Sequence, residues 1–267
     1  MQNIDLIYLT QPLIITVIMF LMIAYYWRKS QFTKWVLLYS LLAYAIAILA
    51  KVAIQIPSVS AVVATDNLFL IGIYFGLQTV FLEVGLAYVF AWYAVSKQHL
   101  ELKEASSYGT GLAFWENGIY LGLLSLVNLL AVFALLASGT PEAQTIYDTL
   151  VSSQPALFYP PLEALPFVAL GTLERISSII VHFAWGYLCV VAAVTGRQKY
   201  LAVALPMGFL DFFVVFSGVL PLYGLEALLF AWAIVSLAIA KVMTKDLQNG
   251  PLFGGASQEE TSSLTSS

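Results

Sequence analysis

The sequence predicts an all-α, polytopic membrane protein with seven transmembrane helices. Of its 267 residues, 61% are hydrophobic and only 10% are charged, whereas a soluble domain carries roughly a quarter charged residues. Several apolar runs reach or exceed the roughly 20 residues that a membrane-spanning helix needs. This composition excludes a cytosolic globular enzyme, a disordered chain and a nucleic-acid-binding protein. The single cysteine, Cys189, excludes an intrachain disulfide framework.

Apolar runs separated by polar breaks define the spans in chain order. The first run is interpreted as a retained helix and not a cleavable signal peptide, because no positively charged segment precedes it. Tyr25, Tyr26 and Trp27 at its end are typical of an interfacial anchor. The predicted spans cover residues 10–28, 33–56, 67–95, 109–138, 171–195, 199–220 and 222–243.

The basic residues predict the orientation of these spans. Nine of the eleven lysines and arginines fall between spans one and two, three and four, or five and six, or after span seven. The alternate connections, at 57–66, 139–170 and 220–222, contain none. The positive-inside rule therefore places the N-terminus outside and the C-terminus in the cytoplasm. The nine are Arg28, Lys29, Lys34, Lys97, Lys103, Arg197, Lys199, Lys241 and Lys245.

The chain divides into a transmembrane domain, residues 1–245, and a short tail. Residues 246–267 are rich in Gly, Ser, Thr and Glu, which is typical of a disordered segment, here on the cytoplasmic side. The connection 139–170 contains five prolines and is either a lid on the membrane surface or a simple connector. The location is integral to a membrane, with several spans, and is the plasma membrane if the source is a prokaryote.

Four ionisable side chains fall at similar depth inside the predicted spans. They are Glu83 in the third, Glu116 in the fourth, His182 in the fifth and Asp211 in the sixth. A charged residue at the centre of a span costs about 2.5–3.5 kcal/mol on insertion scales. In the structural interpretation, these side chains hydrogen-bond to one another and hold the helices together. The functional one is a shared site, in which neighbouring acids activate water or carry protons.

Four other charged residues lie nearer the span ends, where pairing or snorkelling explains them better than function does. They are Lys51, Glu174, Arg175 and Glu226. Arg175 precedes His182 by seven residues and shares its helix face, so we expect it in the outer shell of the site.

A motif in the fourth span carries a family resemblance. Residues 109–120 read GTGLAFWENGIY and resemble the G-x-G-F-A-x-x-E-N-x-x-Y signature of PrsW-type glutamic intramembrane proteases, with Leu112 in the Phe place. Glu83 resembles the motif-one glutamate of that superfamily, which includes CAAX prenyl endopeptidases and YhfC-type proteins. His182 and Asp211 resemble its later polar positions. One departure is that Leu82 precedes Glu83 where fuller motifs have Glu-Glu and a downstream Arg.

The sequence is also similar to the Aph scaffold subunit of γ-secretase, which belongs to the same superfamily and is not regarded as the protease. The similar segments surround Glu83, Tyr108–Asn128, His182–Tyr200 and Pro221. The Glu116 position is not a glutamate in Aph, so Glu116 and Asn117 favour the catalytic branch.

The resemblance implies an intramembrane endopeptidase that cleaves transmembrane or membrane-associated peptides at the bilayer midplane. We expect a water molecule between Glu83 and Glu116, with Glu116 as general base, and His182 stabilising the oxyanion with help from Asn117 or Asp211. The alternatives are a non-catalytic Aph-like scaffold and, less favoured, a proton-coupled transporter. Expected partners are the peptide substrate and the lipid bilayer, with other membrane proteins or a second copy left open.

We expect the chemistry to need no metal or other cofactor, although a divalent cation is the open alternative. The sequence has no H-E-x-x-H motif, and its other histidine, His99, lies in a connection between spans. Three carboxylates with one imidazole form an unusual zinc set. Repulsion among the acids argues the other way, since a divalent cation relieves it as protonation does.

Overall fold

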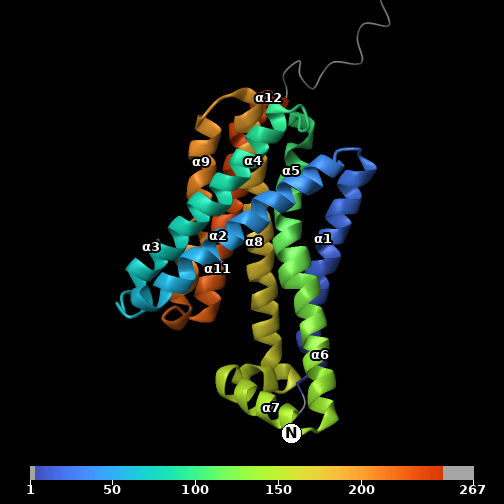
Figure 1. The fold of residues 1–267 in the computed structure, drawn as a ribbon, viewed down its shortest axis with the longest axis vertical. Coiled ribbons are helices and arrows are strands. Elements are labelled where there is room, and N and C mark those ends of the chain that lie inside the picture. Colours follow the sequence, from blue (N-terminus) through green and yellow to red (C-terminus); the bar gives the residue numbers. More distant parts are fainter. Residues whose placement is uncertain (1–3, 249–267) are drawn as a thin grey trace, which may run out of the picture.

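The computed structural model describes residues 4–248, and all regular structure within this range is helical. Seven of its helices are long and apolar enough to cross a membrane, which confirms the predicted number. The two described ends lie at opposite ends of the bundle (Figure 1), as an odd number of spans requires. Which end faces the cytoplasm stays a prediction. The spans are Leu6–Arg28, Lys34–Val63, Leu68–Ser96, Leu102–Ser138, Pro161–Thr195, Lys199–Gly218 and Leu222–Met243.

Four spans are nearly continuous α-helices whose ends are marked by local signals. The Thr33 side chain accepts a hydrogen bond from the Val36 amide and begins the second span, as an N-cap does. Gly196, at φ +67°, ends the fifth in the left-handed conformation that glycine adopts readily. The helices are α1 (Thr10–Arg28), which the short η1 (Leu6–Leu9) precedes, α2 (Lys34–Val63), α8 (Pro161–Thr195) and α11 (Leu222–Met243).

The third and fourth spans each contain a π-helical segment at mid-length. In the third, η2 (Thr79–Val84) separates two α-helices, and in the fourth η4 (Phe114–Leu124) does the same. Such segments are rare and occur frequently at functional sites. The flanking helices are α3 (Leu68–Gln78), α4 (Gly85–Ser96), α5 (Ala105–Ala113) and α6 (Ser125–Ser138), with a short η3 (Leu102–Glu104) before α5.

The sixth span is broken. It consists of α9 (Lys199–Met207), α10 (Leu210–Val214) and a 3-10 turn, η6 (Val215–Gly218). At the break, a side chain on Gly208 would lie 2.9 Å from the Val80 backbone, so the chain passes directly against η2.

The connection 139–170 is helical over most of its length. It contains α7 (Pro141–Ser153), η5 (Pro155–Phe158) and the first ten residues of α8. Three of its prolines stand at helix starts, where the missing amide hydrogen costs nothing. The predicted start of span five, at residue 171, is therefore wrong by ten residues. Whether this connection covers the membrane surface as a lid stays a prediction.

The second span and the tail also differ from the prediction. Helix α2 continues through Pro57 to Val63, seven residues beyond the predicted end. At the other end of the chain, α12 (Lys245–Gln248) extends three residues into the predicted tail. The rest of that tail, 249–267, lies outside the described residues.

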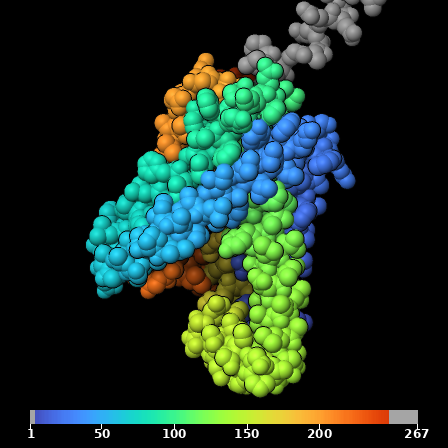
Figure 2. Space-filling model, in the orientation of Figure 1, coloured from blue at the N-terminus to red at the C-terminus, as the bar shows by residue number. Residues whose placement is uncertain are grey.

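Helix α8 is the core of the bundle and contacts α1, α4, α5, α9 and α11. It approaches α5 at glycine positions, where a side-chain carbon added to Gly109 would lie 2.4 Å from the Phe183 carbonyl oxygen. Figure 2 shows α2 crossing one face diagonally, with α6 and α7 projecting beyond it. The third, fourth and fifth spans therefore meet at mid-bundle, where their ionisable residues lie.

Candidate active site

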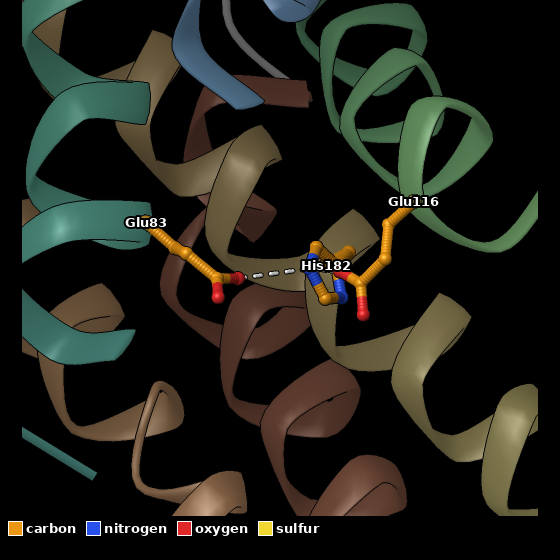
Figure 3. Close-up of side chains that lie close together, drawn as sticks. All are labelled: Glu83, Glu116 and His182. Atoms are coloured by element: carbon orange, nitrogen blue, oxygen red, sulfur yellow. Dashed lines mark hydrogen bonds and ion pairs between the residues drawn. The ribbon is translucent and has the colours of Figure 1, made fainter. Parts of the chain in front are cut away.

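Glu83, Glu116 and His182 converge from three different spans (Figure 3). His182 Nε2 lies 2.5 Å from Glu116 Oε2 and 3.3 Å from Glu83 Oε2. One ligand atom from each residue fits within a group whose members are all within 4.8 Å of one another. His182 is buried and both glutamates are partly buried. Three of the four deep residues predicted from the sequence thus form one cluster.

The π-helical segments carry both glutamates, Glu83 in η2 and Glu116 in η4. The wider π turn changes the direction in which residues on either side of it point, relative to an uninterrupted α-helix. Helical periodicity in the sequence gives no signal for it, so this feature was not predicted.

His182 is oriented from behind by the backbone of its own helix. Its Nδ1 lies 2.9 Å from the Ser178 carbonyl oxygen, and since a carbonyl oxygen only accepts, Nδ1 donates. Nε2 therefore faces the two carboxylates, and the Trp185 ring packs against the imidazole at 4.1 Å between centroids. The Glu116 contact lacks hydrogen-bond alignment, and Oε2 has no hydrogen-bond partner among the described residues.

Asn117, expected beside the oxyanion, lies behind His182. It is fully buried, and its Nδ2 donates to the Ser178 hydroxyl oxygen at 3.2 Å. That hydroxyl is 3.3 Å from His182 Nδ1. Asn117 is therefore placed to support the imidazole indirectly, through the Ser178 hydroxyl.

Lys51 lies beside the cluster, which the sequence interpretation did not predict. It was expected near a span end, but its Nζ contacts Glu83 Oε1 and lies 3.1 Å from Asp211 Oδ2. Thr79 Oγ1 is 2.7 Å from the same Nζ and donates to Asp211 Oδ2. The depth of Lys51 was misjudged because the second span was predicted to end at residue 56. Helix α2 continues to Val63, so Lys51 lies deeper than that prediction implies.

Arg175 bridges the cluster to a further acid. Its guanidinium contacts Glu174 and lies 4.0 Å from Glu116 Oε1, which is the outer position expected for it. Glu226 is buried on α11 and forms no ion pair with the described residues. Cys189 contacts the Val84 carbonyl oxygen and not His182.

A cavity of about 40 Å³ lies among these side chains. Since a buried water needs about 10–15 Å³ by this kind of measure, the cavity has room for a water molecule or an ion. Its walls include all four predicted deep residues, together with Thr79, Glu174, Arg175, Ser178, Trp185, Leu210, Val214 and Leu229.

The cluster fits a divalent metal ion. With His182 Nδ1–H donating backward, the Nε2 lone pair faces two carboxylate oxygens, an arrangement that repels unless a proton or cation lies between them. A metal-binding histidine commonly donates its other ring N–H to a backbone carbonyl, as His182 does. Three protein ligands with an open position is also the pattern of catalytic zinc sites.

Comparison with known proteins agrees with a protease in the membrane. No curated protein and no solved structure gives a significant match. The family model described as YhfC intramembrane metalloprotease matches residues 13–239. This match does not confirm the narrower PrsW and Aph likenesses or the glutamic class, and its name does not support the expected absence of a metal. Because it covers most of the chain, the protein is an integral, multi-pass membrane protein and belongs to the YhfC intramembrane metalloprotease family.

Proposed function

We propose that this protein hydrolyses peptide bonds of membrane-embedded substrates at a centre where Glu83, Glu116 and His182 would hold one divalent metal ion. The observation that carries the proposal is the convergence of three ligand atoms within 4.8 Å of one another, from three helices, beside a cavity of about 40 Å³. The family description supports the same activity. This replaces the metal-free centre that the sequence favoured.

The charges around the cavity support a cation. Four carboxylates, those of Glu83, Glu116, Glu174 and Asp211, border it. Two basic side chains, Lys51 and Arg175, contact them. With these groups ionised and His182 neutral, two negative charges remain uncompensated, and one divalent ion would neutralise them. Unpaired charge inside a membrane is costly, so the composition of the site favours such an ion.

When bound, a divalent ion supplies an activated water and polarises the substrate carbonyl. The protein's own residues hold the ligands and move the proton. Asp211 Oδ2 is occupied by Lys51 and Thr79, while its Oδ1 makes no hydrogen bond within residues 4–248. We assign Asp211 to accept the proton of the attacking water and return it to the leaving amine as the C–N bond breaks. Its side chain is 39% exposed, which suits exchange with water.

Arg175 and Trp185 have supporting tasks. Arg175 lies 4.0 Å from Glu116 and limits the movement of that carboxylate. Trp185 packs on the His182 ring and excludes bulk water from one side. The substrate must unwind locally, because a helical peptide bond is protected by its own hydrogen bonding.

The test uses the full-length protein purified in detergent and returned to liposomes. We expect about one equivalent of divalent metal by elemental analysis, as one three-ligand site implies. A panel of transmembrane peptides read by mass spectrometry should show cleavage that phenanthroline removes and added metal restores. Cleavage by metal-free protein that is still lost in Glu116→Gln would instead support glutamate-activated water. A well-folded protein that takes up no divalent metal and cleaves no peptide even when metal is added would contradict the proposal and favour the scaffold interpretation.

A further inference from the structure

Lys51 lies in the middle of the bundle without a task in the reaction as described. Its ammonium group has three N–H donors and three oxygen partners: Glu83 Oε1, Thr79 Oγ1 at 2.7 Å and Asp211 Oδ2 at 3.1 Å. Every donor is thus used, and none is left for a substrate. Lys51 can therefore influence the site only through these three partners.

The key partner is Glu83, whose two oxygens face different neighbours. Oε1 contacts Lys51, whereas Oε2 points to His182 at 3.3 Å. An ammonium group on one oxygen of a carboxylate takes up one of its lone pairs and repels a cation from that side, so the other oxygen is the one better placed to bind a metal. The Lys51 side chain is 12% exposed, so bulk water competes little with this contact.

We infer that Lys51 is a positioning residue that restricts Glu83 to one-oxygen metal binding and keeps that oxygen, Oε2, directed at the site. This inference rests on the proposed function, since it assumes that Glu83 is a ligand. Lys51 comes from the second span, Glu83 from the third and Asp211 from the sixth, so the second span fixes a ligand that it does not itself supply.

The competing explanation is that Lys51 only holds the helices together. Measuring metal affinity distinguishes this structural role from a role in positioning Glu83. Lys51→Met keeps a similar chain length and removes the charge and donors. We expect Co²⁺ to bind about 10–100-fold more weakly, the usual cost of losing an outer-shell partner of a metal ligand. The visible spectrum of bound Co²⁺ should also change, because Glu83 is free to bind through both oxygens.

Three further variants complete the test, each measured by Co²⁺ titration against a chromophoric chelator and by thermal unfolding of the metal-free protein. Lys51→Arg keeps the charge and should restore much of the affinity. Thr79→Val keeps the contact between Lys51 and Glu83 and should affect the spectrum little. Lys241→Met, at an exposed lysine on the end of α11, is the matched control and should bind Co²⁺ as the wild type does.

The outcomes distinguish this inference from the proposed function. Wild-type Co²⁺ affinity and spectrum in Lys51→Met, with only a lower unfolding temperature, would overturn the inference and leave the metal site in place. If Lys51→Met does not fold, Lys51→Gln decides by the same criteria. A wild-type protein that binds no divalent metal would contradict the proposed function, and the inference with it.

Discussion

His182 is positioned by atoms on the side of its ring away from the two glutamates. The Ser178 carbonyl oxygen fixes its ring N–H, and Asn117 reaches the Ser178 hydroxyl. The imidazole nitrogen that faces the two glutamates is therefore selected by the local helix backbone. At this scale, the chemistry depends on which atom of a side chain is free, and a sequence does not contain that information.

Replacing Glu116 is the most direct test at the level of single residues. Glu116→Gln keeps the shape of the side chain and loses its charge, so a metal ligand or a base is removed with little change in packing. We expect cleavage to fall by at least about 100-fold, beyond the effect typical of outer-shell changes, in the peptide assay read by mass spectrometry. Glu226→Gln, a buried glutamate outside the cluster, is the matched control and should be nearly neutral. Full activity in Glu116→Gln would end the assignment of this residue.

A Ser178 variant distinguishes the two groups that contact His182 Nδ1, namely the Ser178 hydroxyl and the Ser178 carbonyl oxygen. Ser178→Ala removes the hydroxyl but keeps the backbone carbonyl that accepts from Nδ1. Because the main orienting bond is retained, we expect metal content like that of the wild type and a less than about tenfold loss of activity, below the usual range for an essential outer-shell partner. Loss of metal from this variant would show that the hydroxyl, and not the carbonyl, holds the ring.

At the scale of elements, the fourth span combines two functions along one helix. Its glycines bring α5 against α8, and its π-helical segment then carries Glu116. Gly118 and Gly122 form a packing stripe, which faces Met19 and Thr16 of α1. The close contacts on both sides hold the segment in place, which limits movement of the glutamate.

Gly109 tests this close packing. A side-chain carbon at Gly109 would lie 2.4 Å from the Phe183 carbonyl oxygen, so Gly109→Ala must push α5 from α8. Overpacking of this kind costs about 1–3 kcal/mol, and we expect a lower unfolding temperature together with reduced cleavage. Gly218→Ala is the control, because no atom lies within 4 Å of the added carbon. Equal unfolding temperatures for the two variants would contradict the packing described for α5 and α8.

At the scale of the whole molecule, the seven spans leave the two described ends on opposite sides of the bundle (Figure 1). The basic connections all lie at one of these sides, which predicts the cytoplasmic face. The orientation decides from which side water and substrate segments reach the centre.

Cysteine labelling tests this orientation in whole cells. In a Cys189→Ser background, Thr65→Cys lies in the turn between α2 and α3, and Asp246→Cys lies in α12. We expect an impermeant maleimide added outside to label the first position and to label the second only after permeabilisation. The reverse pattern would show that the positive-inside argument fails for this protein.

The sequence by itself determined the number of spans, their approximate centres and three of the residues that meet at mid-bundle. Hydropathy is summed over some 20 residues, so it survives local irregularity. An ionisable residue within an apolar run is visible because the bilayer penalises it so strongly.

Only the tertiary structure decided the rest. Pro57 and the serines that follow it resemble a span end, yet α2 continues through them to Val63, as helices within a membrane can continue past a proline. That continuation carries Lys51 into the site, and the π-helical segments direct Glu83 and Glu116 at His182. Depth and rotation of a helix depend on its neighbours, so contacts between spans, such as those of Lys51 with Glu83 and Asp211, follow from packing that no single segment encodes.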